Sequence, residues 1–313
     1  MKVIETSGLR KEFDVRVRKG MLRREKRIVP AVDGVDLVVE RGEMVGYLGP
    51  NGAGKSTTLK MLTGVLTPTG GTVSVCGLTP VPQRIKLARR IGVVFGNRTQ
   101  LWWDLPLRDS FDLLRHIYRV NALEHAARLR RCRDLLDMDS FLDIPVRQLS
   151  LGQRMRGELT ASLLHGPEIL FLDEPTIGLD VVSKQAVRGF LAELGARGDT
   201  TIVLTTHDLA DIERLCERIV VIDHGKVVHD GTIQALHQRY GSRRRVIADF
   251  DEPWQGSMDL PGVDLESNTG LRAVFQVDEV APLLAVLTQQ RGLRDLSIAE
   301  PEIEEVIAKL YQG

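Results

Sequence analysis

Short apolar runs alternate with helical patterns along most of the chain. The runs are rich in β-branched residues and are bounded by turn residues, a pattern typical of buried strands. They predict strands at 35–39, 44–48, 91–95, 169–172, 201–205 and 219–222. Because segments with helical spacing separate these runs, we expect an α/β fold with helices packed on a sheet.

One strand of this series leads directly into a glycine-rich turn and a helix. Residues 56–66 carry Leu59, Leu62 and Leu66 on one helical face. Strand, glycine-rich loop and helix occur here in the order that a phosphate site requires. Between about 105 and 165 the strand pattern disappears and apolar residues recur at helical spacing, which predicts an inserted helical subdomain at about 98–165.

The pattern changes near Tyr240 to Arg245, where YGSRRR joins a helix-stopping glycine to a basic run. We place a domain boundary there, between a first domain at 1–240 and a second at 246–313. Beyond the boundary the pattern predicts strands at 246–250, 271–277 and 295–299, a helix at 279–290 and a last helix after Pro301. The second domain is therefore expected to be a small α+β appendage with an accessory or regulatory role.

Composition narrows the class of protein. The 313 residues carry 42 Lys plus Arg and 42 Asp plus Glu, so the net charge does not indicate nucleic-acid binding. Cys76, Cys132 and Cys216 are far apart and form neither a disulfide framework nor a metal cluster, which favours a reducing cytosol. We expect no signal peptide and no membrane span, and hence a chain that is not itself a channel.

The glycine-rich turn is a strong chemical motif. Its sequence, GPNGAGKST, matches glycine, four residues, glycine, lysine and serine without a mismatch. The N–H groups of such a loop surround phosphate oxygens, while Lys55 reaches the β and γ phosphates and Ser56 can ligate magnesium. An ordinary glycine turn is disfavoured by the apolar strand and helix on either side. The predicted nucleotide-binding residues are Gly49, Pro50, Asn51, Gly52, Ala53, Gly54, Lys55, Ser56 and Thr57.

Two acids end the apolar strand in ILFLDEP. Asp173 and Glu174 come at its carboxyl end, the edge at which ligands bind in sheets of this kind. Asp173 would hold magnesium, directly or through water, and Glu174 would polarise the attacking water. A helix N-cap is the alternative for either acid.

These motifs, together with LSLGQ at 149–153, GLD at 178–180 and His207 in TTHD, resemble the ATP-binding subunit of an ABC transporter over roughly residues 3–235. The resemblance implies a P-loop NTPase core with a mixed sheet and an N-terminal antiparallel β part, and hydrolysis of ATP with Mg²⁺. In that family, two subunits enclose two ATP molecules. Each ATP lies between the phosphate loop of one subunit and the signature segment of the other, which corresponds to LSLGQ at 149–153 in this chain.

The resemblance implies that the signature residues Ser150, Leu151, Gly152 and Gln153 act in trans on the γ-phosphate of the partner. A hydroxyl and N–H groups at a helix start can bind an anion. By themselves, the same residues could form only an N-capped helix with Ser150 as the cap.

Further roles follow from the resemblance. His207 would contact the γ-phosphate and join Glu174 and Lys55 in catalysis. Asp180 would communicate across the dimer, with a simple turn aspartate as the alternative. Phe13, in the first strand, would stack on the adenine ring, with core packing as the alternative.

The chain departs from the family at two positions. Asn97 stands nearest to the position of a magnesium-ligating glutamine, so Asn97, or Gln100 three residues later, would complete the metal site. Leu151 replaces the usual glycine at the third signature position, and we expect this change to adjust the interface without altering the chemistry.

Other segments indicate partners. Trp102 and Trp103, in a loop expected to be hydrated, indicate a docking surface for a membrane subunit, with core packing of one of them as the alternative. The segment FGNRTQLWWDLP and the ending LSIAEPEIEEV resemble the drug- and antibiotic-resistance branch of exporters. The basic segment 15–27 would form a hairpin that approaches anionic lipid or an acidic permease loop, or that is simply solvated.

We therefore expect an ATPase subunit at the cytoplasmic face of the cell membrane that forms a homodimer and drives a separate permease. A dimer of two related subunits is the alternative to the homodimer. Export of a drug-like or other small molecule is the predicted direction, without a nucleic-acid partner. An importer ATPase shares the same catalytic motifs and is the first alternative. A non-transport ATPase, such as a ribosome-associated factor, is the second, although such relatives usually carry two ATP cassettes in one chain.

Overall fold

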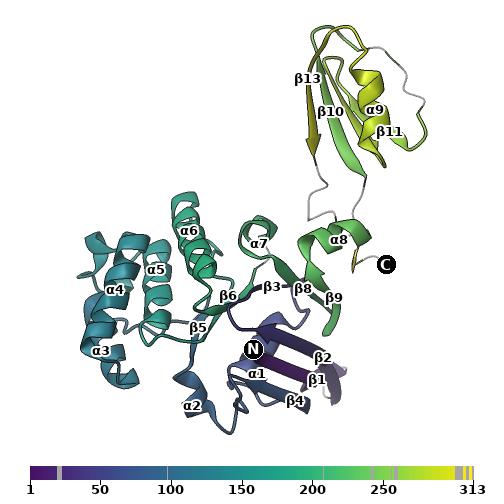
Figure 1. The fold of residues 1–313 in the computed structure, drawn as a ribbon. Helices are drawn as coiled ribbons and strands as arrows, with labels where there is room; N and C mark the ends of the chain where they lie inside the picture. Colours follow the sequence, from purple (N-terminus) through teal and green to yellow (C-terminus); the bar gives the residue numbers. More distant parts are fainter. Residues whose placement is uncertain are drawn as a thin grey trace. The chain divides into compact units, whose positions relative to one another are not determined.

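A six-stranded mixed sheet forms the centre of the N-terminal part of the protein (Figure 1). The computed structural model describes residues 1–19, 23–96, 98–206, 208–240, 243–254, 256, 260–299, 306–307 and 310–311, with backbone only for 16–19, 23–26 and 240. The strand order is β5-β6-β7-β3-β8-β9, and only β8 and β9 pair in antiparallel fashion. The strands are β3 (Met44–Leu48), β5 (Ile91–Phe95), β6 (Ile169–Asp173), β7 (Thr201–Thr205), β8 (Arg218–Asp223) and β9 (Lys226–Thr232). The predicted α/β fold with a mixed sheet is confirmed.

An antiparallel sheet of three strands, in the order β2-β1-β4, forms a second layer. These strands are β1 (Lys2–Lys19), β2 (Arg23–Glu40) and β4 (Gly70–Val75). Apolar side chains of β1 and β2 share one buried core with β3 and the first helix, including Ile4, Leu37 and Tyr47. The two long strands pair as far as Lys19 with Arg23, as expected of a hairpin in the basic segment, whereas residues 20–22 lie outside the described residues.

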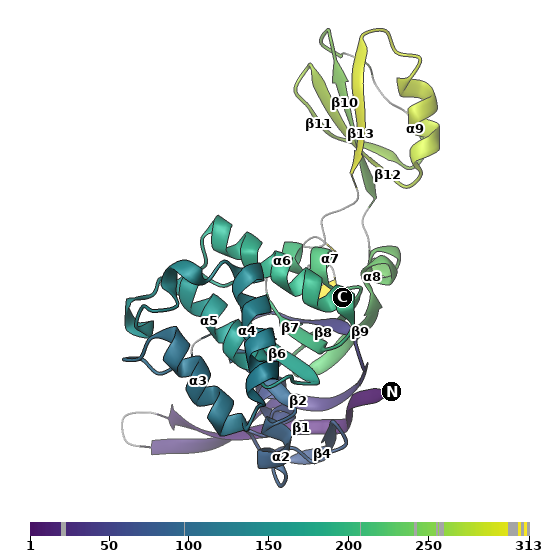
Figure 2. The same cartoon turned by 60° about the vertical axis from the view of Figure 1, so that its left-hand side comes forward.

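Seven α-helices are described in this part of the chain. They are α1 (Lys55–Leu62), α2 (Arg84–Ala88), α3 (Leu107–Tyr118), α4 (Ala122–Leu136), α5 (Leu151–Leu163), α6 (Val181–Arg197) and α7 (Leu209–Leu215). Two short 3-10 helices, η1 (Asp139–Phe141) and η2 (Val146–Gln148), precede α5. The segment between β5 and β6 contains α3, α4 and α5, which lie side by side in both views (Figure 2).

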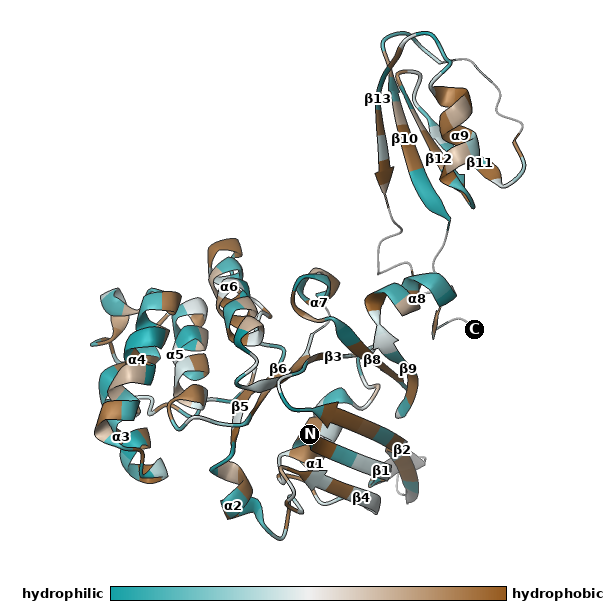
Figure 3. Ribbon diagram, viewed as in Figure 1, coloured by the Kyte–Doolittle hydropathy of each residue, from teal (hydrophilic) through white to brown (hydrophobic). Residues whose placement is uncertain are grey.

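The carboxyl ends of the parallel strands place polar residues at one edge of the sheet. In β6, the four residues from Ile169 to Leu172 are buried and Asp173 emerges at the end. Figure 3 shows β5, which pairs with β6, and β3, which lies two strands away, as hydrophobic too. Asp173 pairs with Phe95 on one side and with Thr205 on the other, so these strand ends are in register. A buried parallel sheet thus brings residues that are distant in sequence to a single edge.

The chain divides into two units, Met1–Thr232 and Ile233–Gly313. The second unit begins with α8 (Ile233–Tyr240), whereas the sequence pattern placed the boundary after this helix. An antiparallel sheet in the order β11-β12-β10-β13 follows, formed by β10 (Arg244–Phe250), β11 (Val263–Asn268), β12 (Arg272–Val277) and β13 (Leu293–Ala299). Helix α9 (Val280–Leu287) contributes Leu283 and Leu287 to a core with Phe275 and Trp254, whose rings meet edge to face at 5.5 Å.

Not every element of the second unit was predicted. The strand β11 escaped prediction because, apart from Val263, all of its residues are exposed and it has no buried face. Of the last helix, Val306, Ile307, Leu310 and Tyr311 are described as helical, while 301–305 lie outside the described residues.

The structure also describes the cysteines and the apolar segments. Cys76, Cys132 and Cys216 are all buried with free thiols. Burial raises the pKa of each thiol, to about 11 for Cys76 and Cys132 and to about 12 for Cys216. Within the described part of the chain, no helix combines the length and the hydropathy that a membrane span requires.

The close packing of β5 on α5 generates a prediction about stability. A Cβ atom at Gly92 would lie 2.3 Å from the carbonyl oxygen of Ser162. We therefore expect Gly92→Ala to lower the free energy of unfolding by about 1–3 kcal/mol, as overpacked substitutions do. In the control Gly189→Ala, on α6, the new Cβ meets nothing within 4 Å, so a gain of about 0.5–1 kcal/mol is expected. Urea unfolding of both variants is the measurement, and equal stabilities would contradict the packing described.

Candidate functional site

The phosphate loop, residues 49–57, connects the end of β3 to the start of α1. Gly54 has φ 109°, and a Cβ atom there would lie 2.4 Å from the carbonyl oxygen of Ala31, so only glycine fits. The Lys55 ammonium donates to the carbonyl oxygens of Gly49 and Pro50, at 2.6 and 3.2 Å. Burial lowers the pKa of Lys55, and the charges of Glu174 and Asp173 oppose this shift. The loop therefore presents a cation beside the two predicted acids.

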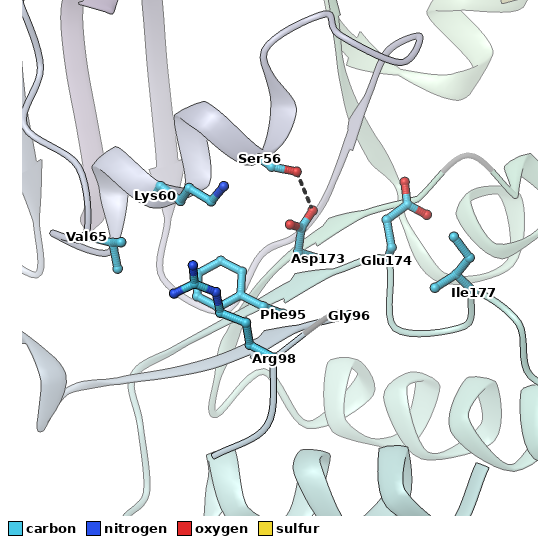
Figure 4. Close-up of a pocket in the computed structure, with 9 residues that line it drawn as sticks. All are labelled: Ser56, Lys60, Val65, Phe95, Gly96, Arg98, Asp173, Glu174 and Ile177. Atoms are coloured by element: carbon cyan, nitrogen blue, oxygen red, sulfur yellow. Dashed lines mark hydrogen bonds between the residues drawn. The ribbon is translucent and has the colours of Figure 1, made fainter. Parts of the chain in front are cut away.

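Asp173 is held by hydroxyl groups from two other segments. Its Oδ1 accepts hydrogen bonds from Ser56 Oγ at 3.2 Å and from Thr205 Oγ1 at 2.6 Å. Figure 4 shows Ser56, from α1, and Asp173, from the end of β6, directed toward each other. Sequence reasoning missed Thr205, although its position at the end of a neighbouring buried strand was a usable signal.

These oxygen atoms suit Mg²⁺. A hydroxyl and a carboxylate are the hard ligands that this ion prefers, and it normally takes only one or two carboxylates besides water and substrate phosphates. Among the described residues there is no group of three or more His, Cys, Asp or Glu that could form a complete metal cage. The residues Ser56 and Asp173 therefore fit an ion shared with a phosphate ligand.

Glu174 has an unusual backbone conformation. Its φ of 57° lies in the left-handed region, which costs a non-glycine residue about 1–3 kcal/mol. The turn is fixed by a hydrogen bond from Glu174 N to the carbonyl oxygen of Thr205 at 3.0 Å, and by one from Ile177 N to the carbonyl oxygen of Glu174 at 3.3 Å. Such strain is concentrated at functional sites, where the surrounding structure holds one side chain in one orientation.

A partly buried network of polar side chains supports this turn. Thr176 Oγ1 donates to Asp211 Oδ2 at 2.6 Å, and both residues are buried. Asp211, on α7, also pairs with Arg188 on α6. Arg188 and Lys184 both pair with Asp208, at 3.2 and 3.0 Å. Sequence reasoning missed this network, for which the acid Asp211 beside the buried Ile212 was the only local signal.

Two cavities adjoin the phosphate loop. One, of about 360 Å³, is lined by Ser56, Lys60, Val65, Phe95, Gly96, Arg98, Asp173, Glu174 and Ile177. The other, of about 490 Å³, is lined by Ala31, Pro50, Asn51, Gly52, Gly54, Lys55, Ser56, Thr57, Glu174 and Ile177. All of the predicted phosphate-loop residues except Gly49 and Ala53, together with both acids, thus line one or the other of these cavities. The first cavity adds Lys60 and Arg98, which the sequence motifs did not indicate.

Other predicted residues lie elsewhere. Phe13 is exposed on β1 with the Lys11 ammonium 5.3 Å from its ring, and it lines neither cavity. Gln100 bonds to Glu158 on α5 through its own N–H and its side-chain amide, each at 3.2 Å. Asn97 and His207 lie outside the described residues.

The signature segment, residues 149–153, starts α5. The Ser150 hydroxyl accepts from Gln153 N at 3.2 Å, while Gln153 Oε1 accepts from Ser150 N at 2.9 Å, so the two residues form a capping box. Leu151 is the first residue of the helix and is not among the positive-φ residues, so its position does not demand glycine. A Cβ atom at Gly152 would lie 2.1 Å from Ser183 Oγ, so α5 starts in close contact with α6.

Asp180 caps the neighbouring helix α6. Its carboxylate accepts from Ser183 N at 2.9 Å and from Ser183 Oγ at 2.7 Å. These hydrogen bonds, first that from the backbone, lower the pKa of Asp180. Val181 and Val182 follow at the surface, 81% and 77% exposed. The start of α6 therefore presents an apolar pair beside a fixed carboxylate.

Fold and site together define a P-loop ATPase. The ABC transporter family matches residues 32–177. The chain is 36% identical over 89% of its length to the Nod factor export ATP-binding protein I of Cupriavidus metallidurans, and covers 91% of that protein. It is 33% identical to the daunorubicin resistance ATP-binding protein DrrA3 of Streptomyces coeruleorubidus, over 90% of both chains. The chain belongs to the family of ABC transporter ATP-binding proteins.

Solved structures agree with this assignment. An ATP-binding subunit of an ABC transporter aligns with a TM-score of 0.65 and 27% identity, over 76% of this chain and 93% of that one. A dimeric ATP-binding cassette in a post-hydrolysis state, bound to ADP and Pi, aligns with a TM-score of 0.63 and 26% identity, over 74% of this chain and 98% of that one. The protein is an ATP-binding, ATP-hydrolysing subunit of an ABC transporter.

The Thr176 contact generates a prediction about catalysis. Thr176→Val keeps the side-chain shape but removes the hydroxyl that donates to buried Asp211. A hydrogen bond to a charged group contributes about 1.5–3 kcal/mol, so we expect kcat to fall about tenfold as the turn at Glu174 loosens, with the Kd for ATP unchanged. Thr176→Ser keeps the hydroxyl and is the matched control. Steady-state ATPase assays and ATP titrations measure both quantities; an equal effect of the two variants would rule out the hydroxyl as the cause.

Proposed function

We propose that this protein binds two ATP molecules between two copies of itself and uses their hydrolysis to drive a separate membrane permease. The observation that carries the proposal is the placement of the signature segment. No described residue of 149–153 lines either cavity at the phosphate loop, and Leu151 is 39% exposed. An exposed helix start with a hydroxyl can bind an anion, which a second copy would supply. Burial of Val181 and Val182 in the same interface would account for their exposure in one chain.

Two residues of the phosphate loop and the two acids have defined roles in this proposal. Lys55 binds the β and γ phosphates, and Glu174 polarises the attacking water. Ser56 and Asp173 would hold Mg²⁺, which neutralises phosphate charge, with Asn97 as a further ligand. Gln100, the other candidate, is bonded to Glu158 and lines neither cavity. Catalysis then rests on positioning and electrostatics.

Four further residues complete the proposed site. Phe13 would stack on adenine through its exposed ring, although it lines neither described cavity. His207 would contact the γ-phosphate. Asp180 would act across the interface, and its position as the cap of α6 gives its carboxylate a fixed orientation. Ser150 would contact the γ-phosphate bound to the other copy.

The permease is proposed to dock beside the signature segment. Trp102 and Trp103 are 37% and 50% exposed, and neither is part of the core. The Arg154 guanidinium lies 5.9 Å from the Trp103 ring. A groove of about 280 Å³ opens here, lined by Phe95, Gly96, Arg98, Thr99, Trp103, Leu151, Arg154, Met155 and Glu158. Large exposed aromatics at the rim of a groove are typical anchors of protein interfaces.

Export is the proposed direction of transport. Relatives that match nine tenths of the chain are named for Nod factor export and daunorubicin resistance. With a permease as its anchor, the protein would lie at the cytoplasmic face of the membrane. In that location the basic segment 15–27 would approach anionic lipid or an acidic loop of the permease.

The composite site predicts a trapped dimer. Glu174→Gln is expected to bind ATP and to elute as a stable dimer, while hydrolysis falls by orders of magnitude because the attacking water loses its base. Lys55→Ala is the control, since it should lose ATP affinity and stay monomeric under the same conditions. Light scattering with ATP and Mg²⁺ measures the mass. A Glu174→Gln variant with near-normal turnover would remove this residue from the role of base.

The transport role predicts a membrane partner. The full chain, tagged and purified from membranes of its own cells, is expected to retain an integral membrane protein that mass spectrometry can identify. Trp103→Ala should release this partner while leaving ATP binding intact, because the aromatic anchor is lost. Retention of ribosomes and of no membrane protein would contradict the transport role.

A further inference from the structure

Glu158 is a buried carboxylate on α5 that lies outside the phosphate site. Only 4% of the residue is exposed. Burial raises the pKa of Glu158, whereas hydrogen bonds from Thr99 and Gln100 and the charge of Arg154 oppose this shift. Burial of a carboxylate costs free energy unless hydrogen bonds compensate for its lost hydration. The donors that bind Glu158 therefore identify the segment that it holds in place.

The partners of Glu158 all belong to one loop. Thr99 Oγ1 donates to Oε1 of Glu158, and Gln100 N donates to Oε2 at 3.2 Å. The side-chain amide of Gln100 donates to the carbonyl oxygen of Glu158 at 3.2 Å. Thr99 Oγ1 also accepts from Leu101 N at 3.1 Å. Glu158 therefore holds the loop 98–101 on α5 through both its side chain and its backbone.

The packing beneath this loop is close as well. Leu101 is buried, and a Cβ atom at Gly157 would lie 3.2 Å from its Cδ1. The residue next to Glu158 thus lets the loop lie directly on the helix. At the upstream end of the same segment, Gly96 N donates to the carbonyl oxygen of Asp173 at 3.0 Å. The segment between Gly96 and Leu101 therefore contacts Asp173, which is proposed to hold Mg²⁺, at one end and α5, the helix capped by Ser150, at the other.

We propose that Glu158 is a positioning residue that fixes the loop 98–101 on α5 and thereby sets the position of the signature segment relative to the phosphate site. This inference rests on the proposed function, in which Ser150 acts on ATP bound to the other copy. Glu158 lies about two helical turns after Ser150 on the same helix, α5. Its contact with the loop therefore fixes the position of Ser150 at the start of that helix. Glu158 itself touches neither ATP nor Mg²⁺ in this account.

The contact also lies at the groove proposed for the permease. Thr99 and Glu158 line it together with Trp103 and Arg154. A partner bound in the groove would contact the loop 98–101, which Glu158 holds. Docking would thus reach the signature segment both at Leu151, which also lines the groove, and through the loop that Glu158 holds.

The test uses the loop side of the contact, because removal of Glu158 itself could prevent folding. Thr99→Val removes the hydroxyl donor without changing the side-chain shape, and Thr99→Ser retains it. Both are made in the full chain with Glu174→Gln, and the affinity of ATP-driven dimerisation and the Kd for ATP are measured separately. Thr99→Val should weaken dimerisation about tenfold, as expected for the loss of a hydrogen bond to a carboxylate, while the Kd for ATP stays within about twofold. Thr99→Ser should match the parent chain.

Three results would overturn the inference. Equal dimer affinities for Thr99→Val and Thr99→Ser would show that the contact does not position the signature segment. A parallel loss of ATP affinity, dimer affinity and melting temperature in Thr99→Val would show a general structural role instead. If the Glu174→Gln parent itself fails to dimerise with ATP, the proposed composite site fails, and the inference fails with it.

Discussion

The site depends on the contacts of Asp173, where four segments of the chain meet. Its carboxylate accepts the hydroxyls of Ser56 and Thr205, and its carbonyl oxygen accepts the N–H of Gly96. These contacts join α1, β7 and the segment after β5 to the end of β6. Because a buried parallel sheet aligns its strand ends, one carboxylate can connect all of these segments, and the geometry of the phosphate loop relative to the acids follows from it.

Two supporting networks lead away from this point. One passes through Thr176 to buried Asp211 and keeps the strained turn at Glu174 in place. The other passes through Gly96 and the loop 98–101 to Glu158 on the helix of the signature segment. Both networks use hydrogen bonds to buried carboxylates, which are strong because few competing water molecules reach them. The phosphate site and the signature segment are therefore separate in space but connected by hydrogen bonds.

The parts of this protein that the sequence predicts are those with a local pattern. The strands 44–48, 91–95 and 201–205 were predicted at the bounds that β3, β5 and β7 have, because buried strands read as apolar runs. The phosphate loop and the acids form contiguous motifs. By contrast, Thr205 binds Asp173, 32 positions away, and Glu158 binds Thr99 and Gln100, 59 and 58 positions away. No local pattern in the sequence shows such partners. In the strand β11 every residue except Val263 is exposed, so it too left no apolar signal.

The proposed function requires that the signature segment of one copy meets the phosphate loop of another. The most direct test is an ATP-dependent disulfide between Asn51→Cys in one chain and Leu151→Cys in a second, both made with Glu174→Gln. Asn51 and Leu151 are exposed, and the three native cysteines are buried, so background reaction is low. We expect a covalent dimer only when both substitutions and ATP are present. A dimer that forms equally well without ATP, or none with ATP, would contradict it.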